Sequence, residues 1–302
     1  MKIGFVAEFN PFHNGHIYLI SEIKRRFPNC EIVVALSSDY VQRGEIACAS
    51  FSERKEIALQ YGVNEVIELD FFTSTQAAHV FAEGSIKKLI SKDVDVICFG
   101  ASDTNNINKY IFAAQTLKDN LEKYNILVKK NLKEGKSYVA STYSAMHQIL
   151  GDEELIPQDI LGFEYTKYII NNNINVKLEC VLRTAEHSSL EGKQKYASAT
   201  LLRKMLKDGK NISQYSPMQI SQPIPKIEDK FLEMKEVIMK SSASELAQIM
   251  LVSEGMENLF KKNISLAKNY SEFIDLCSSK RYTKSRIKRV LLYVLLGIKK
   301  EA

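Results

Sequence analysis

The feature that most constrains this fold is the alternation of apolar runs and amphipathic segments over the first 100 residues. Four runs rich in valine and isoleucine are expected to be strands: residues 2–9, 31–38, 63–69 and 94–100. Three segments between them have helical periodicity: residues 16–27, 52–62 and 77–92. Strands that alternate with helices of about 10–15 residues predict parallel βαβ units. The fold class is therefore α/β, a doubly wound parallel sheet, in which ligands bind beyond the carboxyl ends of the strands.

The remainder of the chain is mostly helical and divides at a proline-rich segment. A helix is expected at 108–124, a further strand at 176–184 and a capped helix at 196–209. Residues 214–226 hold three of the six prolines, which is typical of a linker. We therefore predict two domains, a catalytic domain over 1–213 and a helical, basic domain over 214–302, in agreement with about 100–200 residues per domain.

Composition excludes several classes of protein. With 45% hydrophobic and 25% charged residues, the chain is neither disordered nor a disulfide-rich miniprotein. No apolar run approaches the roughly 18 residues that span a bilayer, so we expect no membrane association. Five cysteines without a CxxC pair, and an N-terminus without the apolar stretch of a signal peptide, favour reduced thiols and the cytoplasm.

The positive charge is concentrated at one end of the sequence. The chain has a net charge of +5, but residues 280–302 alone carry +7 and residues 1–279 carry −2. Such asymmetry favours a polyanionic partner such as nucleic acid. A solvated basic helix face is the alternative that charge alone leaves open.

A histidine motif stands at the expected junction of the first strand and first helix. It reads Phe12-His13-Asn14-Gly15-His16. At such a junction, free backbone N–H groups and the positive end of the helix dipole are expected to face a phosphate. Two imidazoles three residues apart share one helical face and can donate hydrogen bonds to oxygens that gain charge during phosphoryl chemistry. Histidines that only cap the helix or fill the core, and a metal site that lacks a third ligand nearby, are the alternatives.

A second motif, at 198–203, offers another helix N-terminus to an anion. Ser198 is a natural N-cap, and the hydroxyls of Ser198 and Thr200 together with Arg203 suit phosphate oxygens. Alone, this pattern is more often a capped helix with an outward arginine. Its presence in the same chain as the histidine motif makes a phosphate site the better interpretation.

Together these two motifs resemble those of the HxGH nucleotidylyltransferase superfamily. Further segments narrow the resemblance to the tRNA(Met) cytidine acetate ligase family: residues 8–16, 42–45, 99–102, 157–162, 196–200, 280–283, Arg286 and Arg289. The match runs in the same order from residue 1 to about 295. It implies a Rossmann fold of the nucleotidylyltransferase type followed by an α-helical domain. Two differences from the family pattern stand at Gln158, where an Asn is usual, and at 184–188, where only His187 is kept.

The resemblance implies a two-step reaction with ATP (as Mg-ATP), acetate and elongator tRNA(Met). Acetate attacks the α-phosphorus to give acetyl-adenylate and pyrophosphate, and the N4 amine of the wobble cytidine then takes the acetyl group. Catalysis of in-line displacement is mostly positioning and charge stabilisation. The alternatives are an adenylyl or cytidylyl transferase with a small-molecule acceptor, and a non-catalytic nucleotide- or RNA-binding protein.

The resemblance also assigns site residues, with His13 and His16 as the catalytic pair. We predict no metal-ligating residue, and the sequence leaves open whether Mg²⁺ is bound by the protein or only by ATP. The ATP contacts that it implies are Ala7, Glu8, Phe9, Asn10, Pro11, Phe12, His13, Asn14, Gly15, His16, Ile20, Gly100, Gln158, Asp159, Arg183, Ser198, Thr200 and Arg203. The tRNA contacts that we expect are Arg43, Lys280, Arg281, Tyr282, Lys284, Arg286 and Arg289. The basic residues would meet phosphates and the tyrosine would stack on an unpaired base.

Overall fold

The computed structural model describes residues 1–183 and 195–300, so His187 lies outside the described residues. The chain forms two compact units. The first, called the sheet unit, comprises Met1–Tyr40, Ala47–Tyr124 and Met146–Pro225. The second, called the helical unit, comprises Val41–Ile46, Asn125–Ala145 and Lys226–Ala302. The division into domains at residue 213 stays a prediction.

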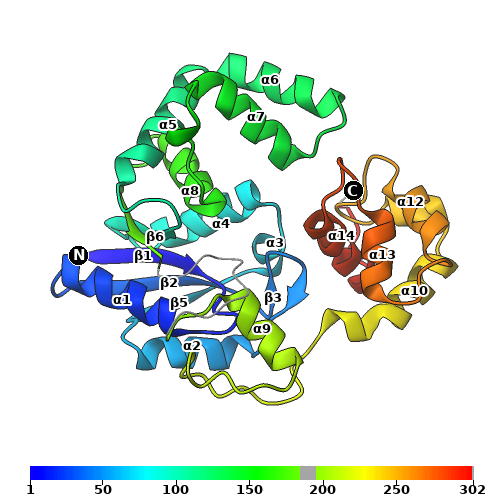
Figure 1. Ribbon diagram of the computed structural model, residues 1–302, viewed down its shortest axis with the longest axis horizontal. Coiled ribbons are helices and arrows are strands. Elements are labelled where there is room, and N and C mark those ends of the chain that lie inside the picture. Colours follow the sequence, from blue (N-terminus) through cyan, green and yellow to red (C-terminus); the bar gives the residue numbers. More distant parts are fainter. Residues whose placement is uncertain (184–194, 301–302) are drawn as a thin grey trace. The chain divides into compact units, whose positions relative to one another are not determined.

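A five-stranded sheet forms the centre of the sheet unit (Figure 1). Its strands are β1 (Lys2–Ala7), β2 (Glu31–Ser37), β5 (Glu65–Leu69), β6 (Val96–Ala101) and β7 (Lys177–Leu182). All neighbours are parallel and the order is β5-β2-β1-β6-β7, which confirms the doubly wound α/β fold. The chain moves outward from β1 to β2 on one side and later to β6 on the other. The carboxyl ends of β1 and β6 therefore form the topological switch point, where such sheets bind ligands.

Helices cover both faces of this sheet. The helical elements of the sheet unit are α1 (Asn14–Arg26), α2 (Phe51–Gln60), α3 (Phe71–Ser74), α4 (Ala78–Ile90), α5 (Ile107–Asp119), η1 (Glu153–Leu155), α8 (Ile160–Asn171) and α9 (Ala199–Lys207). Ile20 of α1 and Ala58 of α2 pack with Phe5 in one core cluster. Gly4 faces the other side, where an added Cβ would lie 3.1 Å from Leu89 of α4. Alternate residues of β1 thus face opposite sides of the sheet, as the pleat requires. Figure 1 shows α1 and α2 on one side of the sheet and α4 on the other.

The helix expected at 108–124 is wrong in extent, because α5 ends at Asp119 and α6 (Leu121–Lys133) begins two residues later. The Asn120 side chain donates a hydrogen bond to the Thr116 carbonyl 2.9 Å away, at the last turn of α5. Asparagine competes with the helix for backbone groups in this way. A second helix, α7 (Tyr138–Leu150), follows α6, and residues 125–145 of this pair belong to the helical unit.

The helical unit is built around an apolar C-terminal helix. Its elements are the short strands β3 (Tyr40–Val41) and β4 (Glu45–Ile46), then η2 (Ile227–Lys230), α10 (Phe231–Lys240), α11 (Ala243–Ala247), α12 (Met256–Asn263), α13 (Tyr270–Cys277) and α14 (Lys284–Leu296). Ile287, Leu291 and Val294 of α14 are fully buried. Phe260 and Phe273 pack with ring centroids 5.7 Å apart in the same core. Within 1–183 and 195–300, no helix is both long enough and apolar enough to cross a bilayer.

Candidate functional site

The histidine motif closes the start of α1 with its own side chains. His13 is the N-cap, and its Nδ1 accepts a hydrogen bond from the Gly15 N–H at 3.0 Å. His16 Nδ1 accepts from the His13 N–H at 3.1 Å, which completes a reciprocal capping box. The Asn14 N–H donates to the Tyr215 carbonyl at 2.8 Å. The prediction of free N–H groups at this helix start is therefore wrong, because imidazole nitrogens and a distant carbonyl satisfy them.

This capping determines which imidazole nitrogen can donate. A neutral ring whose Nδ1 accepts a hydrogen bond carries its proton on Nε2. The His13 and His16 rings stack with centroids 3.8 Å apart and an interplanar angle of 26°. Both are half-buried and thus not sealed in the core. With Nδ1 engaged in this way, the proton of each neutral ring lies on Nε2, and an Nε2–H group is the kind of donor that stabilisation of developing negative charge needs.

Aromatic rings support the second histidine. The Phe9 ring meets the His16 ring edge-on at 4.9 Å, and the Phe12 ring stacks on it at 5.5 Å. Both phenylalanines are fully buried. Phe9 has a φ of 45°, in the left-handed region that a bulky residue adopts only at a cost. Such strain persists where surrounding contacts determine the backbone, commonly at functional sites.

A residue that the sequence reading missed ties this turn to the next strand. Arg54 of α2 is fully buried, and burial lowers the pKa of its guanidinium. It donates to the carbonyls of Glu8 at 2.7 Å, Ser37 at 3.0 Å, Ser38 at 2.7 Å and Ala49 at 3.0 Å. One side chain thus joins the ends of β1 and β2 to the start of α2. The spacing of Arg54 and Ala58 on one helical face was the only signal of its burial.

The second predicted motif lies against the first. Ser198 caps α9, its Oγ accepting from the Leu201 N–H at 3.0 Å. Arg203, one turn further on, donates from Nη1 to the Asn10 carbonyl at 2.8 Å. Asn14 of α1 donates in return to the Lys195 carbonyl at 2.8 Å. The fold therefore brings together two motifs that are about 190 residues apart, while Thr200 stays half-buried on the first turn of α9.

The end of β6 carries another group of predicted residues. Arg183 follows β7 and donates its N–H to the Ala101 carbonyl at 2.8 Å. Its Nη2 lies 2.8 Å from Asp159 Oδ2, while Asp159 Oδ1 accepts from the Gly162 N–H at 2.8 Å and caps α8. A Cβ on Gly100 would lie only 3.0 Å from Arg183 Nε, so this position requires a glycine or a shifted arginine. Asp159 thus orients Arg183 over the bare backbone at Gly100.

Three further predicted ATP contacts take no part in the hydrogen bonds and ion pairs described above. Ala7 and Ile20 are buried in the core cluster beneath the turn, where they support it. Gln158 is exposed, and its side chain donates to the Ile156 carbonyl at 3.3 Å.

Two tyrosines beside this group were not anticipated. The Tyr110 hydroxyl donates to Asp103 Oδ1 at 2.9 Å, and Lys109 Nζ lies 2.7 Å from Asp103 Oδ2. Burial opposes ionisation of Asp103, but these two hydrogen bonds hold its pKa below the ordinary value. Burial, reinforced by the nearby carboxylates of Asp159 and Glu8, raises the pKa of Tyr165 well above its ordinary value. Both hydroxyls remain protonated donors at neutral pH.

Several of the predicted RNA-binding residues are engaged within the helical unit. Glu254 pairs with Arg281 Nη2 at 2.8 Å and with Arg286 Nη2 at 3.0 Å, and Lys284 pairs with Asp275. The Arg286 guanidinium also lies 5.2 Å from the centre of the Tyr282 ring. The Tyr282 hydroxyl donates to the Glu254 carbonyl at 2.6 Å. These contacts cover one face of the tyrosine and neutralise much of the local charge.

Three other predicted RNA-binding cations stand outside this network. Counting contacts with residues 1–183 and 195–300, Arg43, Lys280 and Arg289 make no hydrogen bond or ion pair through their side chains. Arg43 and Lys280 are exposed and Arg289 is half-buried. All three belong to the helical unit, whereas the predicted ATP contacts belong to the sheet unit.

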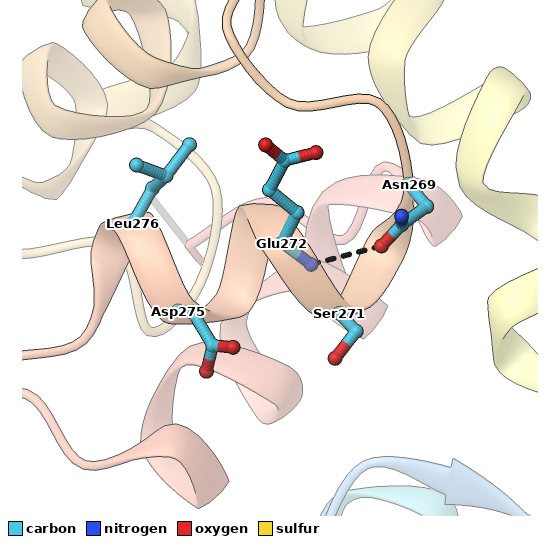
Figure 2. A pocket seen from close by; sticks show the side chains of 5 residues that line it. All are labelled: Asn269, Ser271, Glu272, Asp275 and Leu276. Atoms are coloured by element: carbon cyan, nitrogen blue, oxygen red, sulfur yellow. Dashed lines mark hydrogen bonds between the residues drawn. The ribbon is translucent and has the colours of Figure 1, made fainter.

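A groove along α13 contains none of the predicted residues. It is lined by Asn269, Ser271, Glu272, Asp275 and Leu276, and the Glu272 N–H donates to Asn269 Oδ1 at 2.9 Å (Figure 2). Its two carboxylates disfavour a triphosphate. In the described part of the chain, no group of three or more His, Cys, Asp or Glu side chains could hold a metal ion.

Comparisons with known proteins show the family to which the chain belongs. A family model described as HIGH Nucleotidyl Transferase matches residues 1–302. The tRNA(Met) cytidine acetate ligase of Mycoplasmopsis pulmonis is 49% identical over 299 residues, covering 99% of this chain and all of that protein. The protein of the same name from a Geobacillus species is 32% identical over 317 residues and is covered to 79%.

Solved structures give the same result at the level of the fold. The crystal structure of Thermotoga maritima TmcAL in its apo form matches with a TM-score of 0.88 and 25% identity. The match covers 99% of this chain and 76% of that one. A structure of the same protein bound with alpha-thio ATP matches with a TM-score of 0.85 and 24% identity, which supports the fold alone.

Proposed function

The chain belongs to the tRNA(Met) cytidine acetate ligase family, and from this membership we propose that it acetylates N4 of the wobble cytidine of elongator tRNA(Met) with ATP and acetate. In the first step, an acetate oxygen bonds to the α-phosphorus of ATP and the bond to the β-phosphate oxygen breaks, releasing pyrophosphate. In the second step, the cytidine N4 attacks the acetyl carbon of acetyl-adenylate. AMP leaves, and N4 loses one proton.

The observation that carries this proposal is the pair of stacked imidazoles with both Nδ1 atoms engaged by backbone N–H groups. Their Nε2–H groups would donate to phosphate oxygens as the α-phosphorus becomes five-coordinate. Because the capping box holds the rings before ATP arrives, little free energy is spent on ordering them at the moment of reaction.

The remaining predicted ATP contacts would position the nucleotide around this pair. Arg203, held on the Asn10 carbonyl, and the hydroxyls of Ser198 and Thr200 would bind phosphate oxygens. Arg183, oriented by Asp159, would meet the nucleotide where Gly100 leaves room for it. Mg²⁺ would arrive with the ATP phosphates.

The basic residues of the helical unit would bind tRNA. Arg43, Lys280 and Arg289 would contribute most, because no carboxylate within 1–183 and 195–300 pairs with them. This division assigns adenylate formation to the sheet unit and tRNA binding to the helical unit. Such an enzyme would work in the cytoplasm, where its tRNA is found.

Incubation of the chain with elongator tRNA(Met), ATP and acetate, followed by nucleoside analysis, tests the proposal. The expected product is N4-acetylcytidine at the wobble position, with one AMP and one pyrophosphate per acetyl group. Acetate-dependent pyrophosphate exchange without acetylated tRNA would instead indicate a small-molecule acceptor. RNA binding with no ATP turnover under any condition would indicate a non-catalytic binding protein.

A further inference from the structure

The turn between β3 and β4 packs against α14 without space for a side chain. Gly44 has a φ of 73°, and a Cβ added to it would lie 2.8 Å from the backbone N and Cα of Arg289. The ion pair between Lys288 Nζ and Glu45 Oε1, at 2.7 Å, joins the same two segments. The hairpin therefore places Arg43, the residue before Gly44, beside the turn of α14 that carries Arg289.

Arg289 differs from its basic neighbours on α14. Lys284, Arg286 and Lys288 each pair with a carboxylate, at Asp275, Glu254 and Glu45 respectively. Arg289 is half-buried and has no such partner among residues 1–183 and 195–300. Burial, and then the charge of Arg286, lower the pKa of Arg289 to about 10. At neutral pH its charge is nevertheless retained, and a partly desolvated cation without an acceptor is costly.

We propose that Arg289 and Arg43 together bind a phosphate group of the RNA backbone at the junction of the β3–β4 turn and α14. An anion there would supply the acceptor that residues 1–183 and 195–300 do not provide, and a guanidinium can bind two phosphate oxygens at once. Glu45 and Glu254, which pair with Lys288 and Arg286 of α14, are already engaged and do not compete. A polyanion is the occupant that the +7 charge of residues 280–302 favours.

This inference rests on the proposed function, because it assigns a subsite to the tRNA. The experiment measures the affinity of the full chain for elongator tRNA(Met) by filter binding over a series of KCl concentrations. Each phosphate contact contributes about 0.7–0.9 to the slope of log K against log salt. Arg289→Gln and Arg43→Gln are each expected to reduce the slope by about this amount and the affinity by roughly 3–10-fold at low salt.

Lys240→Gln is the matched control, because it removes a charge from an exposed position of α10 that pairs with Glu236. It should leave the slope within error of wild type. Equal slope changes for Lys240→Gln and Arg289→Gln would overturn the proposal, and so would an unchanged slope for both arginine variants. Arg43 is exposed, so its variant remains informative even where Arg289→Gln fails to fold.

A second pair of variants tests the geometry. Gly44→Ala forces a Cβ into the backbone of α14, whereas Gly135→Ala changes a glycine of similar φ, 81°, with nothing within 4 Å of the added atom. Only Gly44→Ala should weaken tRNA binding, by roughly the same 3–10-fold as loss of one arginine. Equal affinities for the two variants would contradict the docking of Arg43 beside Arg289.

The source of the phosphate is tested with inorganic phosphate in a thermal-shift titration. Inorganic phosphate that stabilises wild type but not Arg289→Gln would show that an anion binds at Arg289. If Arg289→Gln also leaves the slope of log K for tRNA against log salt unchanged, the site binds a free anion and the proposal is overturned. If wild type binds tRNA with the predicted slope but makes no N4-acetylcytidine, the proposed function fails and this subsite stands.

Discussion

Two regions are predicted to bind phosphate groups: the histidine turn of the sheet unit and the basic surface of the helical unit. They differ in how their polar side chains are held. In the turn, the Nδ1 atoms of both imidazoles accept hydrogen bonds from backbone N–H groups, and the His16 ring packs against two buried phenylalanines. On the basic surface, long side chains pair with carboxylates at exposed positions. The first region is therefore ordered before a ligand binds, as electrostatic catalysis requires. In the second region, a polyanion would have to compete with the carboxylates for the same cations.

The strongest test of preorganisation is removal of the buried arginine. Arg54→Met should lower the free energy of unfolding by at least about 3 kcal/mol, because several buried carbonyls lose their donor and each costs about 1–3 kcal/mol. Urea denaturation measures the change. Lys55→Met, at an exposed neighbouring position, is the control and should be nearly neutral. Similar costs for the two variants would mean that Arg54 does not hold the turn.

Replacing the second imidazole separates capping from catalysis. His16→Ala should slow acetate-dependent pyrophosphate release at least about 10²-fold, since one lost donor to developing charge costs that much. His16→Ala also removes the acceptor of the His13 N–H, which should lower the free energy of unfolding. His16→Asn keeps an acceptor there, so it should restore the free energy of unfolding but not the rate of pyrophosphate release. His147→Ala, at an exposed position of α7, is the control and should change neither the stability nor the rate. If His16→Ala retains the wild-type rate within threefold, the imidazole pair does not stabilise the transition state.

Charge reversal on the basic surface of the helical unit should weaken tRNA binding without changing the rate of acetyl-adenylate formation in the sheet unit. Lys280→Glu combined with Arg281→Glu is expected to weaken tRNA binding by about tenfold at low salt, because it opposes the phosphate backbone. Formation of acetyl-adenylate without tRNA should remain at the wild-type rate. The measurement is filter binding beside pyrophosphate exchange, and loss of both together would contradict the division of labour between the two units.

The smallest effect concerns the ion pairs of the basic surface. The hydrogen bond from Arg281 lowers the pKa of Glu254 in the folded chain. The resulting stabilisation is present above the unfolded pKa of about 4.3 and is lost as pH falls through the lower folded value. Because the pair is partly exposed, it contributes less than about 1 kcal/mol. Urea unfolding should show that Glu254→Gln is less stable than wild type at neutral pH and that this difference disappears in acid. A difference in free energy of unfolding that stays constant with pH would mean that the ion pair is not its cause.

The order of strands and helices in the sheet unit could be predicted because valine-rich runs and helical periodicity are local patterns. The end of β1 could not be predicted, because the chain leaves the sheet after Ala7 although Phe9 continues the alternation of apolar residues. The break at Asn120 was missed for a similar reason, since one asparagine inside a helical pattern ends the helix only where its side chain bonds to the preceding turn.

The sequence by itself determined where the two motifs predicted to bind phosphate lie, since each stands at a helix start marked by its own capping residues. Only the tertiary structure decided that Arg203 reaches the Asn10 carbonyl and that Arg54 is buried. It also decided that Lys288 is paired, whereas Arg289 has no such partner among residues 1–183 and 195–300. Caps and periodicity involve residues within a few positions of each other. The Arg203 and Lys288 contacts join residues 193 and 243 positions apart, so they exist only after the chain has folded.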